Sequence, residues 1–144
     1  MDRTDGEIQV EREAVLLELA GAYQRRELAV FETAVRPDMS LTLGGSSRLA
    51  GTYVGYDAFG RYLEVLRRVL RSAGQPITFV HEKNEMTFRQ VMVVYGPKHD
   101  AEMALVVTVL YDDEGKITSF LVLPEDQGLF DYVVDTSLPA EVFI

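Results

Sequence analysis

His81 and Tyr23 are the two side chains of this sequence whose type and setting best suit acid–base or hydrogen-bonding chemistry. In the run ITFVH, an extended chain places His81 on the same face as Ile77 and Phe79. A single imidazole among apolar neighbours is a candidate general base. The alternative is a histidine satisfied by a neighbouring strand or at a sheet rim, because the sequence reveals no carboxylate on that face to orient it.

Hydroxyl groups supply the next candidates. Tyr23 falls on the same helical stripe as Leu19, from which its hydroxyl could donate to a ligand carbonyl. The simpler interpretation is core packing with an incidental hydrogen bond. Thr42 could offer a second hydroxyl near a pocket, although a β-branched residue is also an ordinary strand former. These residues therefore predict hydrogen bonding to a ligand more readily than a defined reaction.

The composition excludes several kinds of function. A chain of 144 residues matches one domain, and 23 acidic against 14 basic residues give a net charge of −9. This charge disfavours nucleic acid and anionic membranes as partners. With no cysteine and two histidines there is no thiolate nucleophile and little material for a metal site, so we expect neither a metal nor another cofactor.

No targeting or membrane segment is visible. The opening residues MDRTDGEIQVE lack an apolar signal core. The longest strand-like apolar stretch, residues 104–110, is far shorter than the roughly 20 residues of a membrane span. We therefore expect a soluble, cytoplasmic protein.

Apolar spacing predicts three helices in the first half of the chain. The first runs from about Glu11 to Arg26, and a short second helix over residues 28–35 ends at Arg36-Pro37. A long helix follows over residues 57–73, with Asp57 suited to cap its start and glycine just beyond its end.

The remaining pattern predicts strands. Residues 39–43 form a weak strand that returns through residues 52–54 after a Gly-Gly-Ser-Ser turn. Four further strands follow from residue 77, namely ITFVHEKNEM, RQVMVVY, MALVVTVLY and KITSFLVL. Turns at residues 96–100 and 112–115 make these strands antiparallel.

The third of these four strands is apolar on both faces. Leu105, Val107, Val109 and Tyr111 share one face, whereas Ala104, Val106, Thr108 and Leu110 share the other. Helices can cover only one face, so the other requires the chain's tail or a second subunit. We expect a homodimer formed through the face of Val106, Thr108 and Leu110.

Two segments suggest a family. Residues 49–58 read LAGTYVGYDA, and FLVLPEDQ at residues 120–127 follows DEGKI. Both resemble SnoaL-like proteins of the nuclear transport factor 2-like superfamily, over roughly residues 11–135 of a single SnoaL-like domain spanning residues 1–144. The resemblance implies an α+β fold, in which a conical, curved antiparallel sheet wraps around N-terminal helices and one long helix and encloses a central pocket.

The resemblance implies a fold more specifically than a reaction. The superfamily contains ketosteroid isomerase, polyketide cyclases and binding domains without chemistry. Aligned by element boundaries, the catalytic positions of ketosteroid isomerase fall on Leu19, Leu43 and Val107, which can neither abstract a proton nor stabilise an enolate. We therefore expect no steroid isomerase activity.

The expected pocket is mostly apolar. Its candidate catalytic groups are His81 and Tyr23, and its candidate ligand-binding wall is Leu19, Thr42, Leu43, Phe79, Val107, Val109, Phe120 and Val122. This pattern predicts binding of an apolar small molecule, either by a simple binder or by an isomerase- or cyclase-like enzyme acting on a polycyclic or polyketide-type compound. The alternative is a non-enzymatic dimerisation or assembly module whose cone is filled by its own side chains. An open pocket of about 300–1,000 Å³ would favour the first hypothesis.

Overall fold

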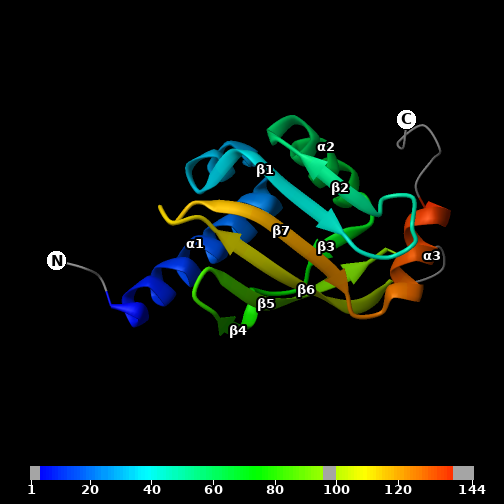
Figure 1. Ribbon diagram of the computed structural model, residues 1–144. Coiled ribbons are helices and arrows are strands. Elements are labelled where there is room, and N and C mark those ends of the chain that lie inside the picture. The colour runs from blue at the N-terminus through cyan, green and yellow to red at the C-terminus, as the bar shows by residue number, and fades with distance from the viewer. Residues whose placement is uncertain (1–3, 96–99, 138–144) are drawn as a thin grey trace.

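The computed structural model describes residues 4–95 and 100–137, and it has the expected α+β class (Figure 1). Its elements, in chain order, are α1 (Asp5–Arg25), the 3-10 helix η1 (Leu28–Thr33), β1 (Val35–Leu43), β2 (Gly51–Val54), α2 (Tyr56–Leu66), β3 (Leu70–Ser72), β4 (Ile77–His81), β5 (Glu85–Val94), β6 (Ala101–Tyr111), β7 (Ile117–Pro124) and α3 (Gln127–Ser137).

The strands form one mixed sheet in the order β2-β1-β7-β6-β5-β3, with β4 also pairing with β5. Strand β1 runs parallel to β7, with Leu41 beside Phe120, whereas the other pairs are antiparallel. The expectation of a purely antiparallel sheet was therefore wrong. A parallel pair needs a long connection, and here the whole chain between β1 and β7 supplies it.

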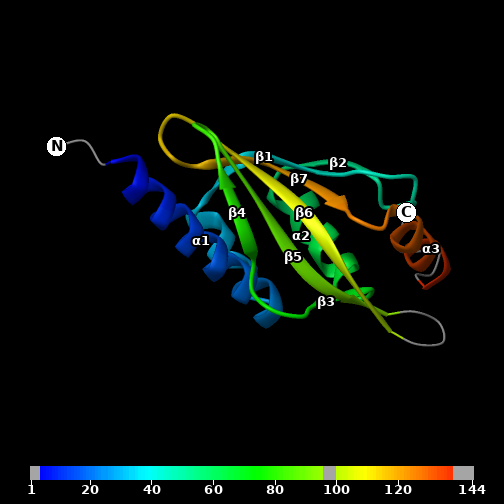
Figure 2. The same cartoon turned by 90° about the horizontal axis from the view of Figure 1, so that it is seen from below.

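The sheet curls into a half-barrel, and α1 lies along its concave side (Figures 1 and 2). The predicted faces of β6 are confirmed, because Leu105, Val107, Val109 and Tyr111 are all buried. On the opposite, convex side, Leu110 of the same strand is exposed. The alternation of β6 thus determines which of its side chains line the interior.

Helix α1 begins at Asp5, earlier than the expected Glu11. The Thr4 hydroxyl accepts a hydrogen bond from the backbone N–H of Glu7 at 3.2 Å, as an N-cap does. The helix ends where Arg26 adopts a left-handed conformation with φ 61°. The additional turns extend α1 past the edge of the sheet, and this extension forms one wall of the groove described below.

Helix α2 ends at Leu66, seven residues before the expected end. Its apolar continuation enters β3 instead, where Leu70 pairs with Val94. Asp57 is not the cap, because Gly55, with φ 89°, occupies that position. Asp57 lies in the first turn, where its charge favours the positive end of the helix dipole.

Two strand boundaries also differ from expectation. The predicted strand over residues 77–86 is broken at Glu82, whose N–H donates to the carbonyl of Glu85. Strand β5 starts at Glu85. Strand β1 begins at Val35 rather than Met39. It tolerates Pro37 because its register with β7 shifts between Val35 and Ser40, where a ladder hydrogen bond is not required.

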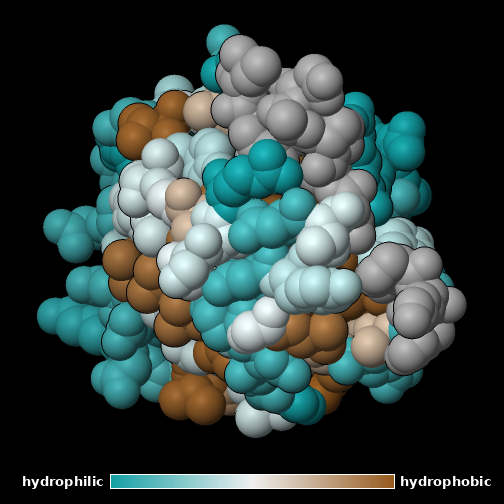
Figure 3. Space-filling view, turned by 90° about the vertical axis from the view of Figure 1, so that its right-hand side faces the viewer, coloured by the Kyte–Doolittle hydropathy of each residue, from teal (hydrophilic) through white to brown (hydrophobic). Residues whose placement is uncertain are grey.

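Helix α3 was not predicted. The Asp126 carboxylate accepts from the N–H of Leu129 at 3.0 Å near the start of this helix. Its buried residues Phe130, Val133 and Val134 join the core at the end of the molecule away from the N-terminus (Figures 1 and 2). Seen from that end, brown hydrophobic patches flank a teal band of hydrophilic surface (Figure 3).

The turn predicted at residues 112–115 is present, with Gly115 at φ 82°. The turn predicted at residues 96–100 lies mostly outside the described residues. Within the described parts of the chain, no helix has the length and apolar character needed to cross a membrane.

Candidate functional site

The interior of the half-barrel contains a small apolar cavity, the cone cavity, of about 130 Å³. It lies between α1, α2 and the concave face of the sheet. Its lining residues are Leu16, Leu19, Ala20, Tyr23, Phe31, Leu41, Phe59, Tyr62, Leu63, Leu66, Ser72, Phe88, Gln90, Met92, Leu105, Val107, Phe120 and Val122. Four phenyl rings belong to this wall, and three of them form a cluster, with Phe59 lying 5.2 Å from Phe31 and 5.8 Å from Phe120 between ring centroids.

Five of the ten expected site residues line this cavity, namely Leu19, Tyr23, Val107, Phe120 and Val122. Thr42 lies elsewhere, at an intermediate level of exposure, where its hydroxyl pairs with that of Thr52 at 2.9 Å. Leu43 and Val109 are buried in the core beyond the cavity wall. The ring of Phe79 packs 5.8 Å from that of Phe88 instead.

Tyr62 is a cavity residue that sequence reasoning did not select. Its side chain is fully buried, and its hydroxyl has no hydrogen-bond partner among the described residues. Burial raises the pKa of Tyr62 above its ordinary value, so the hydroxyl stays protonated as a donor. The available signal was its position three residues after Phe59 and four before Leu66 on one helical stripe.

Tyr23 contributes a second hydroxyl, which donates to the carbonyl of Leu70 at 3.5 Å. Burial raises the pKa of Tyr23, and the guanidinium of Arg67, 5.1 Å from the ring centroid, partly opposes this shift. Arg67 directs its guanidinium toward Tyr23 rather than into solvent. Its guanidinium nitrogens are buried and make no hydrogen bond within the described parts of the chain.

The other polar groups of the cavity wall are engaged. The Gln90 amide donates to the carbonyl of Gly74 at 2.8 Å, and the Ser72 hydroxyl accepts from Gln24 at 2.7 Å. Within the described wall, neither an imidazole nor a carboxylate lines the cone cavity. The cavity can therefore hold an apolar group and hydrogen-bond one acceptor through Tyr62.

A second hollow, the rim groove, is larger and polar. Its volume is about 1060 Å³, and it runs between the first half of α1, η1 and the turns that follow β4 and β6. Leu19 lines both the rim groove and the cone cavity. The two hollows therefore adjoin one another at this side chain.

His81 lines the rim groove rather than the cone cavity, so the structure separates it from Tyr23. Its Nε2 lies 2.6 Å from a carboxylate oxygen of Glu13 on α1. The sequence revealed no carboxylate on the strand face of His81, and the structure supplies one from α1. The available signal was that Glu13 precedes Leu16 by three residues and Ala20 by seven, which places it at the edge of the buried stripe.

Tyr111, at the end of β6, is the second buried polar group of the groove. Arg12 lies over its ring at 4.1 Å from the centroid and also donates to the carbonyl of Lys83 at 3.2 Å. Burial raises the pKa of Tyr111 to about 12, and Arg12 partly opposes this shift. The Tyr111 hydroxyl has no hydrogen-bond partner among the described residues.

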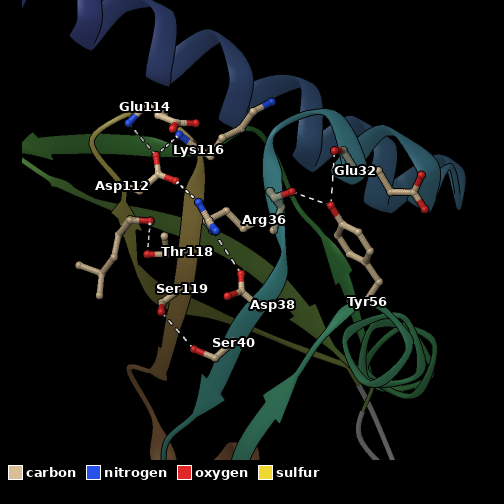
Figure 4. A network of polar contacts seen from close by, with 12 residues as sticks. Glu32, Arg36, Asp38, Ser40, Tyr56, Asp112, Glu114, Lys116, Thr118 and Ser119 are labelled. Carbon is tan, nitrogen blue, oxygen red and sulfur yellow. Dashed lines mark hydrogen bonds and ion pairs between the residues drawn. The ribbon is translucent and has the colours of Figure 1, made fainter.

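A polar network holds the turn at the edge of the groove (Figure 4). Asp112 accepts from the backbone N–H groups of Glu114 and Lys116 and from Arg36 on β1. Lys116 in turn donates to the carbonyl of Thr33 at 2.6 Å. These contacts lower the pKa of Asp112, chiefly through the Arg36 hydrogen bond, and fix the turn to β1 and η1.

In the part of the chain that the structure describes, no group of three or more His, Cys, Asp or Glu side chains has an arrangement that could hold a metal ion.

The fold is similar to those of several solved structures. No protein-family model and no curated protein matches the sequence. Among solved structures, TerC co-crystallised with polyporic acid has a TM-score of 0.71 and 18% identity, over 85% of this chain and 97% of TerC. A nuclear transport factor 2-like protein from Burkholderia pseudomallei has a TM-score of 0.69 and 20% identity, over 91% and 98% of the two chains.

A third structure, described as a SnoaL-like polyketide cyclase from Jannaschia sp. CCS1, has a TM-score of 0.70 and 13% identity, over 96% and 99% of the two chains. The chain has the nuclear transport factor 2-like fold. The fold inferred from LAGTYVGYDA and FLVLPEDQ is thereby confirmed.

In this nuclear transport factor 2-like chain, the two motifs have structural roles. Tyr53, within the first motif, donates to the carbonyl of Leu49 at 2.6 Å and closes the loop before α2. Asp126, within the second, accepts the hydrogen bond near the start of α3. Neither Tyr53 nor Asp126 lines the cone cavity or the rim groove, whereas Phe120 and Val122 of the second motif line the cone cavity.

Proposed function

We propose that the chain binds a small, largely apolar organic compound whose ring end, bearing one acceptor oxygen, occupies the cone cavity. One observation carries this proposal: Tyr62 lines an apolar cavity, and its buried hydroxyl has no hydrogen-bond partner among the described residues. An unsatisfied buried hydroxyl costs about 1–3 kcal/mol. A ligand oxygen that accepts from Tyr62 would offset that cost.

The size of the cavity limits the ligand. An apolar cavity of about 150 Å³ stays dry and binds benzene. The cone cavity, at about 130 Å³, is smaller than the expected pocket of about 300–1,000 Å³, and it suits at most one ring or a short branched chain. A polycyclic or polyketide-type compound would place one ring here and extend beyond it.

The fold neighbours support a small-molecule ligand. TerC was co-crystallised with polyporic acid, and another neighbour is described as a polyketide cyclase. Proton-transfer chemistry like that of a cyclase or isomerase would need a base, and His81 lies in the rim groove instead of the cavity. The proposal is therefore for binding rather than for a named reaction.

The test uses toluene as the probe and two matched substitutions. Val107→Trp fills the cavity, whereas Val54→Trp adds the same side chain at an exposed position on β2. Toluene binding is measured by NMR chemical-shift changes, and we expect it to be saturable in the parent and in Val54→Trp. In Val107→Trp the affinity for toluene should fall about a hundredfold, or by about 2.8 kcal/mol. Circular dichroism confirms that each variant is folded. If the parent does not bind toluene, or if Val107→Trp binds it like the parent, the cone is a filled core and the proposal is wrong.

We also propose that two copies of the chain pair through the convex face of the sheet. Leu121 and Leu123 are 40% and 45% exposed there, and their strand partners are Thr108 and Val106. Side by side, these groups form an apolar patch of the kind that an interface covers. Sedimentation of the parent at micromolar concentration should give a dimer, and the double substitution Leu121→Glu, Leu123→Glu should give the 16.2 kDa monomer. A monomeric parent would contradict this pairing.

A further inference from the structure

The rim groove contains two buried polar atoms that lack hydrogen-bond partners among the described residues. They are Nδ1 of His81 and the hydroxyl of Tyr111. Both side chains are at least nine-tenths buried, and both belong to the wall of the groove. Buried polar atoms are rarely left unpaired in folded proteins, so this concentration in one hollow points to a ligand.

Glu13 determines what His81 offers to such a ligand. When the imidazole is neutral, Nε2 carries the proton that it donates to Glu13 at 2.6 Å, because a carboxylate only accepts hydrogen bonds. Nδ1 then retains its lone pair and is an acceptor. Tyr111, protonated at neutral pH, offers a hydroxyl that donates or accepts. The pair therefore matches a group that both donates and accepts.

The charges around the groove restrict the ligand further. Seven carboxylate side chains and three cationic ones line it, which opposes an anion. An ammonium group would meet Arg12, which lies directly over the Tyr111 ring. A neutral hydroxyl meets neither obstacle, and its single oxygen both donates and accepts a hydrogen bond.

The groove and the cone cavity are close enough to share one molecule. Leu19 lines both. Along β6, Val107 lines the cavity, and Tyr111 on the same face lines the groove four residues later. At about 3.3 Å per residue these positions are about 13 Å apart along the strand. That separation is the length of an elongated organic molecule and exceeds the size of one ring.

We infer that the rim groove binds the hydroxyl-bearing end of an elongated, uncharged ligand whose apolar end enters the cone cavity past Leu19. This inference rests on the proposed binding function and specifies its ligand class as an aryl or alicyclic alcohol or phenol. The hydroxyl donates to Nδ1 of His81 and accepts from Tyr111.

The test compares 6-phenylhexan-1-ol, which is about 13 Å long, with the anion 6-phenylhexanoate and with toluene. Each is titrated against the parent chain, Tyr111→Phe and Tyr132→Phe by calorimetry or NMR. Tyr132 lies on α3 and is 56% exposed, so its substitution is the matched control. Toluene occupies only the cone cavity and reports whether that site is intact in each variant.

We expect the parent to bind the alcohol about tenfold more tightly than the anion, a difference of about 1.4 kcal/mol. Tyr111→Phe should weaken alcohol binding about fivefold and leave toluene binding unchanged, whereas Tyr132→Phe should change neither. Equal affinity for alcohol and anion, or an unchanged affinity in Tyr111→Phe, would overturn the groove inference while toluene still binds. A parent that fails to bind toluene would instead remove the proposed function.

Discussion

The cone cavity and the rim groove meet at Leu19, yet they differ in size, polarity and the state of their polar atoms. The cavity holds about 130 Å³ among apolar side chains, whereas the groove holds about 1060 Å³ among charged ones. The same face of β6 contributes Val107 to the first and Tyr111 to the second. One strand face can thus supply apolar affinity at one end and hydrogen bonding at the other.

Helix α1 also contributes side chains to both hollows. Near its start, Arg12 and Glu13 meet Tyr111 and His81, and near its end Tyr23 lines the cavity. Leu19, between these two regions of α1, lines both hollows. Substitutions on either side of this residue should therefore separate the roles of the two hollows.

The largest effect is expected for Leu19→Ala, which removes the side chain between the hollows. Leu19 is 3% exposed, so the free energy of unfolding should fall by about 2–5 kcal/mol, as measured by urea denaturation. The opened passage should strengthen binding of 6-phenylhexan-1-ol relative to toluene. If the ratio of the two affinities stays as in the parent, Leu19 does not separate the hollows.

Removing a single tyrosine hydroxyl should change the free energy of unfolding by a smaller amount, and the change should have opposite signs at Tyr62 and Tyr53. Tyr62→Phe should raise the free energy of unfolding of the ligand-free chain by about 1 kcal/mol, because its buried hydroxyl has no partner among the described residues. Tyr53→Phe should lower it by about 1 kcal/mol, because that hydroxyl donates to Leu49.

Chemical denaturation of both variants measures this difference. The ring contact between Tyr53 and Tyr62, with centroids 4.9 Å apart, remains in each variant. A loss of stability in Tyr62→Phe equal to that in Tyr53→Phe would mean that the Tyr62 hydroxyl is satisfied in the free protein. The cavity would then lack its hydrogen-bonding group.

The smallest effect concerns the edge of the groove and depends on pH. The pKa of Asp112 is lowered from its ordinary 3.8, chiefly by the Arg36 hydrogen bond, so its ionised form stabilises the folded chain above that pH. Asp112→Asn should therefore slightly lower the melting temperature at pH 7. The difference should disappear as the pH falls through the lowered pKa and Asp112 becomes protonated in the folded chain.

Thermal melts of the parent, Asp112→Asn and Asp113→Asn between pH 7 and pH 2 measure this dependence. Asp113 is exposed in the same turn and serves as the control. A stability difference for Asp112→Asn that grows as the pH falls would contradict the sign of the assigned shift.

The wrong prediction for the end of α2 and the missed helix α3 share a physical cause. Leu66, Val69 and Leu70 satisfy a helical period, but Leu70 is held in β3 by pairing with Val94, a partner 24 residues away. The spacing of Phe130, Val133 and Val134 does fit a helix, and α3 forms where that stripe packs against the core. Local patterns permit several structures, and distant packing selects among them.

By itself, the sequence determined the α+β class and the inward face of β6, because alternation and turn residues act between neighbours in the chain, and the resemblance of two motifs indicated the fold family. Tertiary structure alone decided that β1 pairs in parallel with β7, that Tyr62 faces an apolar cavity and that Glu13 meets His81 across 68 residues. Contacts of this kind depend on where whole elements pack, and no local period in the sequence records that placement.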